Sequence, residues 1–372
     1  MNSIEEIFLI IVRASLFSGR RPDKYEMDEG QWDSLFSLAR THKLLGVVLD
    51  EVSCHPSNLS FRQRAKWTVV VAQAKKSFAH KREVLLHFRD LLAARDIPLM
   101  LLKGQGIAAL YPKPELRVSS DIDIYTRGCF QQVNEMARNM GLVFEEDIDK
   151  HSAFIFEDVI IENHRKVNDG INAATKAVSD LLLARLDSFA DTSPDLPGIL
   201  LPDKDIYAFY VLMHTIYHYE WMAWDEENIV LGQIVDLALV FEHYGKIMDW
   251  GYFGRICNET RLKYPFSLFA MVIKKYLGIS IAEDCYLAPC SDKSVDMVMN
   301  DVFSPGIHPL KAKNPVSKAV QAIRLRFNHF RKYRMIYREP FPVAFYRELQ
   351  SISGHLGRFF RRHIGKNISN CS

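Results

Sequence analysis

Cysteine is scarce in this chain, and no two cysteines have the spacing of a metal-binding or redox motif. Six are scattered along 372 residues, and none forms a C-x-x-C pair. This spacing argues against a zinc ribbon and a dense disulfide framework, and it is typical of proteins from a reducing compartment. We therefore expect free thiols and a cytoplasmic location.

The sequence also lacks a long hydrophobic run and a large charge of one sign. No window approaches the roughly 18 to 20 uncharged apolar residues that span a bilayer, and no signal-peptide cleavage pattern follows the short apolar run Ile7–Val12. We therefore expect no transmembrane segment and no signal peptide. The formal net charge is +2, so the charge balance does not indicate a general polyanion-binding surface.

The spacing of apolar residues divides the chain into parts. Helical spacing dominates the first part, strand patterns begin at a short apolar run, and helical spacing returns after a proline-containing stretch at 186–205 that we expect to be a loop. The expected helices are 5–17, 29–42, 60–95, 206–220, 229–244 and 265–277; the expected strands are 99–102, 120–125, 154–156 and 159–164, the last two as a hairpin. The predicted modules are an N-terminal helical module (1–92), an α/β core (93–190), a C-terminal helical module (191–310) and a basic, aromatic-rich helical tail (311–372).

Two aspartates on one predicted strand form the strongest chemical signal. The period of two places Asp121 and Asp123 on one face of this strand and sends Ile122 and Ile124 into the core. Two unpaired carboxylates on one face repel each other, and a hard divalent cation relieves that repulsion. Mg²⁺ takes one or two carboxylates plus substrate phosphates. The pair therefore predicts a metal site for a phosphate-containing substrate.

Residues on neighbouring segments extend this predicted site. Glu162 lies on a strand that offers His164 on the same face, which makes Glu162 a candidate third ligand. A buried-type strand ends at Lys103 and Gly104, where a glycine turn offers backbone N–H groups to a phosphate and the lysine adds a charge. Arg117 is equally consistent with a phosphate contact and with a structural ion pair.

Taken in order, these motifs resemble the uncharacterised nucleotidyltransferases related to DNA polymerase β. That family has a strand ending in LKG, a YP pair, an Arg, an S-D-I-D strand and a later E-x-H strand. The likeness is close over about residues 97–165 and looser around His214, Asp236 and Asp249. It implies an α+β fold, with a small mixed sheet of the polymerase β type between N-terminal and C-terminal helical modules.

The resemblance also implies a cofactor, a substrate and roles for particular residues. The cofactor is Mg²⁺ or Mn²⁺, and the substrate is a nucleoside triphosphate. Two departures limit the comparison: better-known relatives have Gly-Ser in place of Lys103-Gly104, and Gln233 stands where the family often has a basic residue. The implied catalytic metal ligands are Asp121, Asp123 and Glu162, with His164 beside them, and the implied nucleotide-binding residues are Lys103, Gly104, Arg117 and Ser120.

The resulting hypothesis is a metal-dependent transferase that moves an NMP from an NTP to a hydroxyl through a two-metal Asp/Asp/Glu site. The acceptor stays open between a small molecule, a sugar phosphate, a protein and an RNA end. The main alternative is a nucleotide-binding or scaffold protein with the same fold and no turnover. The intact set of acids argues against it, because carboxylates that hold no metal repel one another.

Three weaker patterns point to other functions. Gly104–Ala109 fits the dinucleotide-binding fingerprint, but Tyr111-Pro112 ends the following helix too early for a βαβ crossover. A DxD glycosyltransferase would normally have a longer nucleotide-binding region before its metal site. His214 and His218 lack the glutamate of H-E-x-x-H, which favours packed or solvent-facing histidines over a zinc site.

The C-terminal part is strongly basic. Residues 311–366 contain fourteen Lys or Arg and two acids, interleaved with aromatic residues. This pattern fits a helical face packed on the body, a nucleic-acid site, and a contact with anionic lipid. We favour packing and keep a weak polyanion contact as the alternative. The apolar residues expected to cover the helical body are Ile323, Phe327, Phe330 and Ile336.

Overall fold

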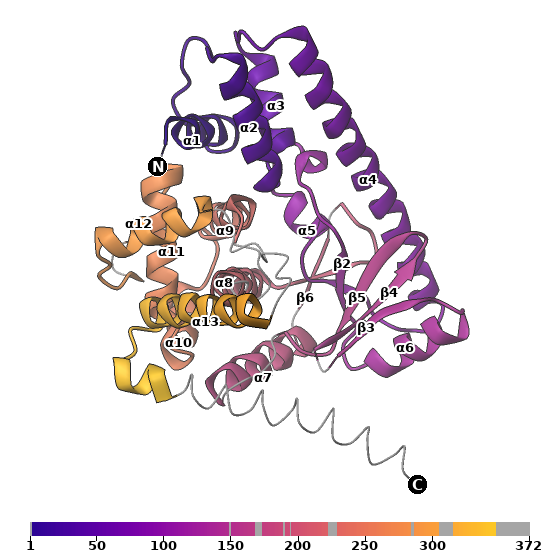
Figure 1. Cartoon of the computed structure of the whole chain (residues 1–372). Helices are drawn as coiled ribbons and strands as arrows, with labels where there is room; N and C mark the ends of the chain where they lie inside the picture. The colour runs from indigo at the N-terminus through magenta and orange to yellow at the C-terminus, as the bar shows by residue number, and fades with distance from the viewer. Residues whose placement is uncertain are drawn as a thin grey trace. The chain divides into compact units, whose positions relative to one another are not determined.

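The structure, a computed structural model, describes residues 2–148, 150–167, 173–188, 190–193, 195–221, 229–283, 286–304 and 315–346. These residues form two compact units, one drawn from 1–215 and 230–303 and the other from 216–229 and 304–372. The first unit contains the sheet and most of the helices (Figure 1). Among the described residues, no helix is both long enough and apolar enough to cross a membrane.

The N-terminal part is helical, as predicted. Its helices are α1 (Ser3–Leu16), α2 (Glu29–Thr41), α3 (Leu45–Cys54) and α4 (Phe61–Ala93). Asn2, Asp28 and Ser60 begin α1, α2 and α4 with capping boxes, which satisfy N–H groups that the helix leaves unpaired. Helix α3 was not predicted, because most of its side chains are buried and a helix that is apolar on nearly all sides shows no amphipathic period.

Seven strands form one mixed sheet with the order β3-β4-β5-β2-β1-β7-β6. Strand β2 runs antiparallel to β1 and parallel to β5, and β1 runs parallel to β7. A mixed sheet flanked by helices confirms the predicted α+β class. The strands are β1 (Met100–Leu101), β2 (Ile122–Tyr125), β3 (Phe144–Asp147), β4 (His151–Phe156), β5 (Val159–His164), β6 (Ala190–Thr192) and β7 (Leu200–Pro202).

The loop predicted at 186–205 is wrong in part, because this stretch contributes β6 and β7. These strands pair with each other, and Leu200 lies opposite Met100 on β1. The sheet therefore continues past the module boundary that we expected near residue 190. Each of the two strands has three residues, which is too short for an alternating pattern to be recognised in the sequence.

One face of the sheet forms the main core of this region. It packs against the end of α4 and against α6 (Phe130–Asn139). Because side chains alternate along a strand, Ile122 and Ile124 of β2 and Val159 and Ile161 of β5 face this core, and Asp123 and Glu162 lie on the opposite face. The core side chains of these elements are Val84, Leu85, Phe88, Leu92, Ile122, Ile124, Val133, Met136, Phe154, Phe156, Val159 and Ile161.

The remaining elements of the first unit are mostly helical. The predicted helices at 206–220, 229–244 and 265–277 are confirmed as α8, α9 and α11. Four cysteines of the described chain, Cys54, Cys129, Cys257 and Cys290, are free thiols, as expected. The elements are α5 (Gln105–Ala108), the 3₁₀ turn η1 (Pro114–Leu116), α7 (Ala173–Ser188), α8 (Lys204–Trp221), α9 (Leu231–Tyr244), α10 (Trp250–Glu259), α11 (Lys263–Leu277) and α12 (Asp292–Phe303).

The second unit contains α13 (Pro315–Tyr337) and the end of α8. Tyr337 donates a hydrogen bond to Glu220 at 3.1 Å, which joins these two helices. Ile323 and Phe327, which we expected to cover apolar surface on the helical body, are 67% and 68% exposed, and their packing on that body stays a prediction. Ile336 is buried. The basic residues of the predicted tail beyond position 346 lie outside the described residues.

His42 joins the N-terminal helices to α9 in the first unit. Its Nδ1 accepts a hydrogen bond from the Leu231 backbone N–H at 3.1 Å, and its ring stacks on Phe8 at 5.7 Å. Burial lowers the pKa of His42 from 6.5 to about 4, because the buried ring has no acid partner to stabilise its charged form. The folded protein therefore holds this histidine neutral.

We predict that protonation of His42 lowers the free energy of unfolding by about 2 kcal/mol when the pH falls from 7 to 5. Between pH 6.5 and 4, His42 is protonated in the unfolded chain and neutral in the folded protein. The contribution of His42 to stability is therefore complete above this window and is lost as the pH falls through it. Urea unfolding of wild type and His42→Asn at both pH values measures the effect as a difference. An equal pH dependence in the two proteins would contradict this assignment.

Candidate active site

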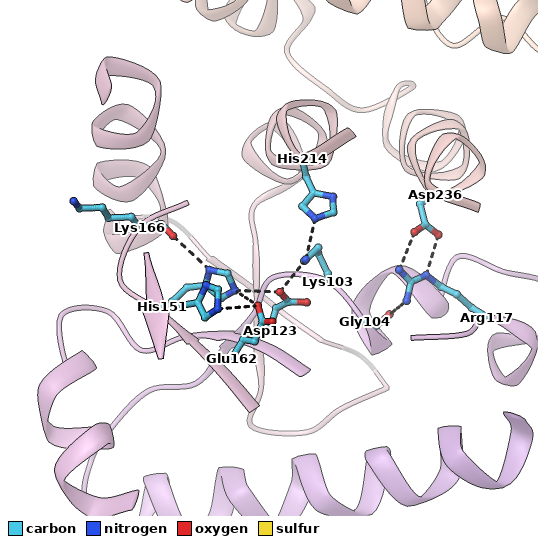
Figure 2. A network of polar contacts seen from close by, with 10 residues as sticks. Lys103, Gly104, Arg117, Asp123, His151, Glu162, Lys166, His214 and Asp236 are labelled. Atoms are coloured by element: carbon cyan, nitrogen blue, oxygen red, sulfur yellow. Dashed lines mark hydrogen bonds and ion pairs between the residues drawn. The ribbon is translucent and has the colours of Figure 1, made fainter. Parts of the chain in front are cut away.

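Strand register brings the acidic residues and histidines of the sheet together. Asp123 on β2 lies opposite Glu162 on the parallel strand β5, and His164 on β5 lies opposite His151 on β4. All four belong to the face of these strands that points away from the core with α4 and α6, since they alternate with the core residues. Figure 2 shows these side chains converging, with Lys103 approaching from the end of β1.

Two positive side chains contact Asp123. Lys103 Nζ lies 2.8 Å from Asp123 Oδ1, and His164 Nε2 lies 3.1 Å from the same oxygen. Burial by itself would raise the pKa of Asp123, but Lys103 and His164 hold it well below its usual range. Burial would lower the pKa of Lys103, and Asp123 raises it instead. The pair is therefore charged at neutral pH.

The two histidines of the site differ in charge. His164 Nε2 also lies 3.3 Å from Glu162 Oε2, and its Nδ1 faces the Lys166 carbonyl at 3.4 Å. Burial alone would lower the pKa of His164, but hydrogen bonds to the two acids outweigh it and raise the pKa. Burial lowers the pKa of His151. His164 is therefore a cation between two carboxylates, whereas His151 is neutral.

Asp121 lies one residue before β2 and is partly buried. Its carboxylate makes no ion pair with any described residue. Burial and the nearby charge of Asp123 raise the pKa of Asp121, as expected for an acid in a crowded negative site. Asp121 and Asp123 lie outside the group His151, Glu162 and His164, whose potential ligand atoms are all within 4.8 Å of one another.

Arg117 makes a structural ion pair in this structure. Its Nε and Nη2 donate to the two oxygens of Asp236 on α9 at 2.9 and 2.8 Å, and Nη1 donates to the Gly104 carbonyl at 3.0 Å. Tyr111 donates to the same Asp236 at 2.8 Å. Both charged side chains are 12% exposed. This arrangement anchors the turn at Gly104 to α9.

The remaining predicted nucleotide-binding residues lie beside this anchor. Gly104 has φ 61° and ψ −117°, a conformation that residues with a Cβ avoid. It precedes the four-residue helix α5, whose shortness agrees with the rejection of a dinucleotide-binding crossover. Ser120 is exposed. Among the described residues, no side-chain partner holds Ser120 in place.

The sequence did not single out Lys81 on α4. Lys81 donates a hydrogen bond to the Ser119 carbonyl. Burial lowers the pKa of Lys81, Asp121 raises it, and Lys43 and Arg117 lower it further, so these charges lie near one another. A lysine on a long, largely polar helix resembles a solvated residue, and only the packing of α4 reveals its neighbours.

His214 and His151 also lie at the site, and the sequence indicated their place there only weakly. His214 Nε2 accepts from Lys103 Nζ at 2.9 Å, so this nitrogen is unprotonated and the ring supports the Lys103–Asp123 pair (Figure 2). His214 is half-buried, and its interpretation as a packed or solvent-facing histidine stays a prediction. His151 follows residues that no motif marks, and only its cross-strand position opposite His164 could have indicated it.

We predict that Arg117→Met and Asp236→Leu each lower the free energy of unfolding by about 3–5 kcal/mol, because each leaves an unpaired buried charge. The double variant should lose less than the sum of the two changes, since neither charge then remains. Urea unfolding without nucleotide measures this cycle. Additive losses would show that the pair does not stabilise the fold.

The described geometry can be compared with known proteins. The family described as uncharacterised nucleotidyltransferase matches residues 28–278, a range that contains every predicted site residue. No curated protein and no solved structure matches the chain. Since the family match covers more than half of the sequence, we conclude that the chain belongs to the family of uncharacterised nucleotidyltransferases.

Proposed function

We propose that this chain transfers a nucleoside monophosphate from a nucleoside triphosphate to a hydroxyl acceptor. Nucleotidyl transfer in general follows from the family. The site is supported by Asp121, whose partly buried carboxylate has no ion-pair partner among the described residues, whereas Lys103 and His164 pair with Asp123 and Glu162. A divalent cation bound at Asp121 would compensate this charge.

The predicted ligands suit Mg²⁺ or Mn²⁺, because Asp121, Asp123 and Glu162 all offer hard carboxylate oxygens. Such an ion lowers the pKa of an acceptor hydroxyl and stabilises charge on the departing pyrophosphate. Glu162 is the base that we assign to the hydroxyl proton. Burial would raise the pKa of Glu162, but its hydrogen bond with His164 lowers it, so Glu162 is ionised and able to accept a proton.

Positive side chains near Asp121 supply the contacts for the triphosphate. Lys43 and Arg117 both repel the Lys81 ammonium group, and an anion beside Lys81 would relieve this repulsion. We assign a phosphate contact to Lys81. Lys103 is a second contact, since its ammonium group can exchange the Asp123 carboxylate for a substrate phosphate.

Arg117 contributes to this site through the backbone. Its guanidinium group donates hydrogen bonds to Asp236 and to the Gly104 carbonyl. We therefore assign Arg117 the role of positioning the turn at Gly104. The backbone of that turn and the Ser120 hydroxyl are the remaining proposed nucleotide contacts. Both lie within the segment that joins the ends of β1 and β2.

We predict that Asp121→Asn lowers nucleotidyl transfer by at least about 100-fold, the scale at which one electrostatic group contributes to catalysis. The thermal midpoint should stay equal or rise, because the change removes like-charge repulsion without breaking an ion pair. Pyrophosphate release from each of the four NTPs, with Mg²⁺ or Mn²⁺ and a cell extract as acceptor source, measures the activity.

Asp147→Asn is the matched control. It removes a carboxylate from β3 of the same sheet, where Asp147 pairs with Arg138 at the surface, and it should leave transfer unchanged. Asp123→Asn should lose activity and also stability, because it leaves the buried Lys103 without its carboxylate. Wild-type rates of pyrophosphate release in Asp121→Asn would remove this residue from the site.

A further inference from the structure

Two histidines and a glutamate on the β4–β5 hairpin lie close enough together to chelate an ion. His164 Nε2 is 3.3 Å and His151 Nε2 is 4.0 Å from Glu162 Oε2. One potential ligand atom from each residue lies within 4.8 Å of the others. The side chains of His164, His151 and Glu162 are 3%, 9% and 22% exposed. The cluster is therefore shielded, with Glu162 as its most exposed member.

These separations are close to those of a metal chelate. Two ligands at about 2.1 Å from a tetrahedral ion are about 3.4 Å apart. The glutamate–His164 pair already has this separation, and the glutamate–His151 pair exceeds it by less than an ångström. Since the two histidine nitrogens also lie within 4.8 Å of each other, we expect side-chain rotations to bring all three atoms to bonding distance.

The backbone fixes two of the three side chains in this arrangement. His151 and His164 are directly opposed on antiparallel strands, and their ring centroids are 5.2 Å apart. His164 Nδ1 faces the Lys166 carbonyl, the contact by which metal-binding histidines are commonly oriented so that Nε2 points at the ion. The hairpin therefore directs His164 Nε2 into the cluster, and binding of an ion there would release the Nε2 proton and replace the contact with Asp123.

His151 has ligand capacity that the protein does not use. The residue is buried, and its Nδ1 has no hydrogen-bond partner among the described residues. Its Nε2 contacts Glu146 at 3.0 Å, but that glutamate is half-exposed, and such a contact contributes little. Because Nδ1 makes no hydrogen bond to a described residue, a rotation of the ring that brings Nε2 to an ion breaks only the exposed contact with Glu146.

We propose that His151, Glu162 and His164 bind a divalent transition-metal ion, with Zn²⁺ and Co²⁺ as the chemical class. Imidazole nitrogens suit these ions, whereas Mg²⁺ prefers oxygen ligands. The site is thus distinct in donor chemistry from the carboxylates Asp121 and Asp123. Binding does not depend on nucleotidyl transfer, but a catalytic use of this ion through the shared Glu162 rests on the proposed function.

Titration of the EDTA-treated full chain with Co²⁺ tests the site without nucleotide. The wild-type protein should show visible d–d absorption that saturates at one ion, and Zn²⁺ should displace it. His151→Gln should weaken Co²⁺ binding by at least about 10-fold. Asp121→Asn should bind Co²⁺ with wild-type affinity even if it transfers no nucleotide. Loss of Co²⁺ binding therefore tests the metal site, and loss of nucleotidyl transfer tests the proposed function.

His87→Gln is the matched control, because His87 pairs with Glu157 at 2.7 Å outside the cluster, and it should bind Co²⁺ as wild type does. Should His151→Gln fail to fold, anomalous diffraction from wild-type crystals soaked in Zn²⁺ decides: a peak within bonding distance of His151, Glu162 and His164 is expected. Wild-type Co²⁺ affinity in folded His151→Gln, or no Zn²⁺ peak at these residues, overturns the proposal.

Discussion

The buried ion pair between Lys103 and Asp123 is the contact on which the candidate site depends. A buried carboxylate is costly unless a partner compensates its charge. Lys103 at the end of β1 and His164 on β5 both contact one oxygen of Asp123, so Asp123 remains ionised within the sheet. The backbone beside this pair is also fixed, because the Leu102 N–H donates a hydrogen bond to the Asp123 carbonyl. A charged acid on a rigid strand is what a metal-dependent transferase requires.

Much of the fold and part of the site could be predicted from the sequence. Capped helices and the strand with alternating Asp and Ile carry local signals, and these elements were found. The three-residue strands β6 and β7 carry no such signal, because β7 pairs with β1, about a hundred positions away in the chain, and β6 pairs with β7. Motif spacing indicated Lys103, Asp123, Glu162 and His164, which contact one another in the structure. His151, Lys81 and the partner of Arg117 depend on tertiary packing and could not be inferred.

The two ion pairs of the first unit have different consequences. Lys103 and Asp123 lie among other titratable groups, and each can exchange its partner for a ligand. Arg117 and Asp236 form a bidentate pair supported by Tyr111 and by a backbone carbonyl, which makes exchange costly. The second pair therefore holds α9 to the turn at Gly104, while the first remains available for chemistry. One type of interaction, a buried salt bridge, therefore serves both the fold and the proposed reaction.

A nucleotidyltransferase attaches the α-phosphorus of its substrate to the acceptor, so labelling at two positions of the triphosphate is the most direct test of the proposed reaction. The wild-type chain is incubated with a divalent cation, an acceptor extract and NTP labelled either at the α- or at the γ-phosphate. We predict that α-label enters the acceptor and that γ-label leaves as pyrophosphate. Transfer of γ-label to an acceptor, with formation of the diphosphate, would show a phosphotransferase and contradict it.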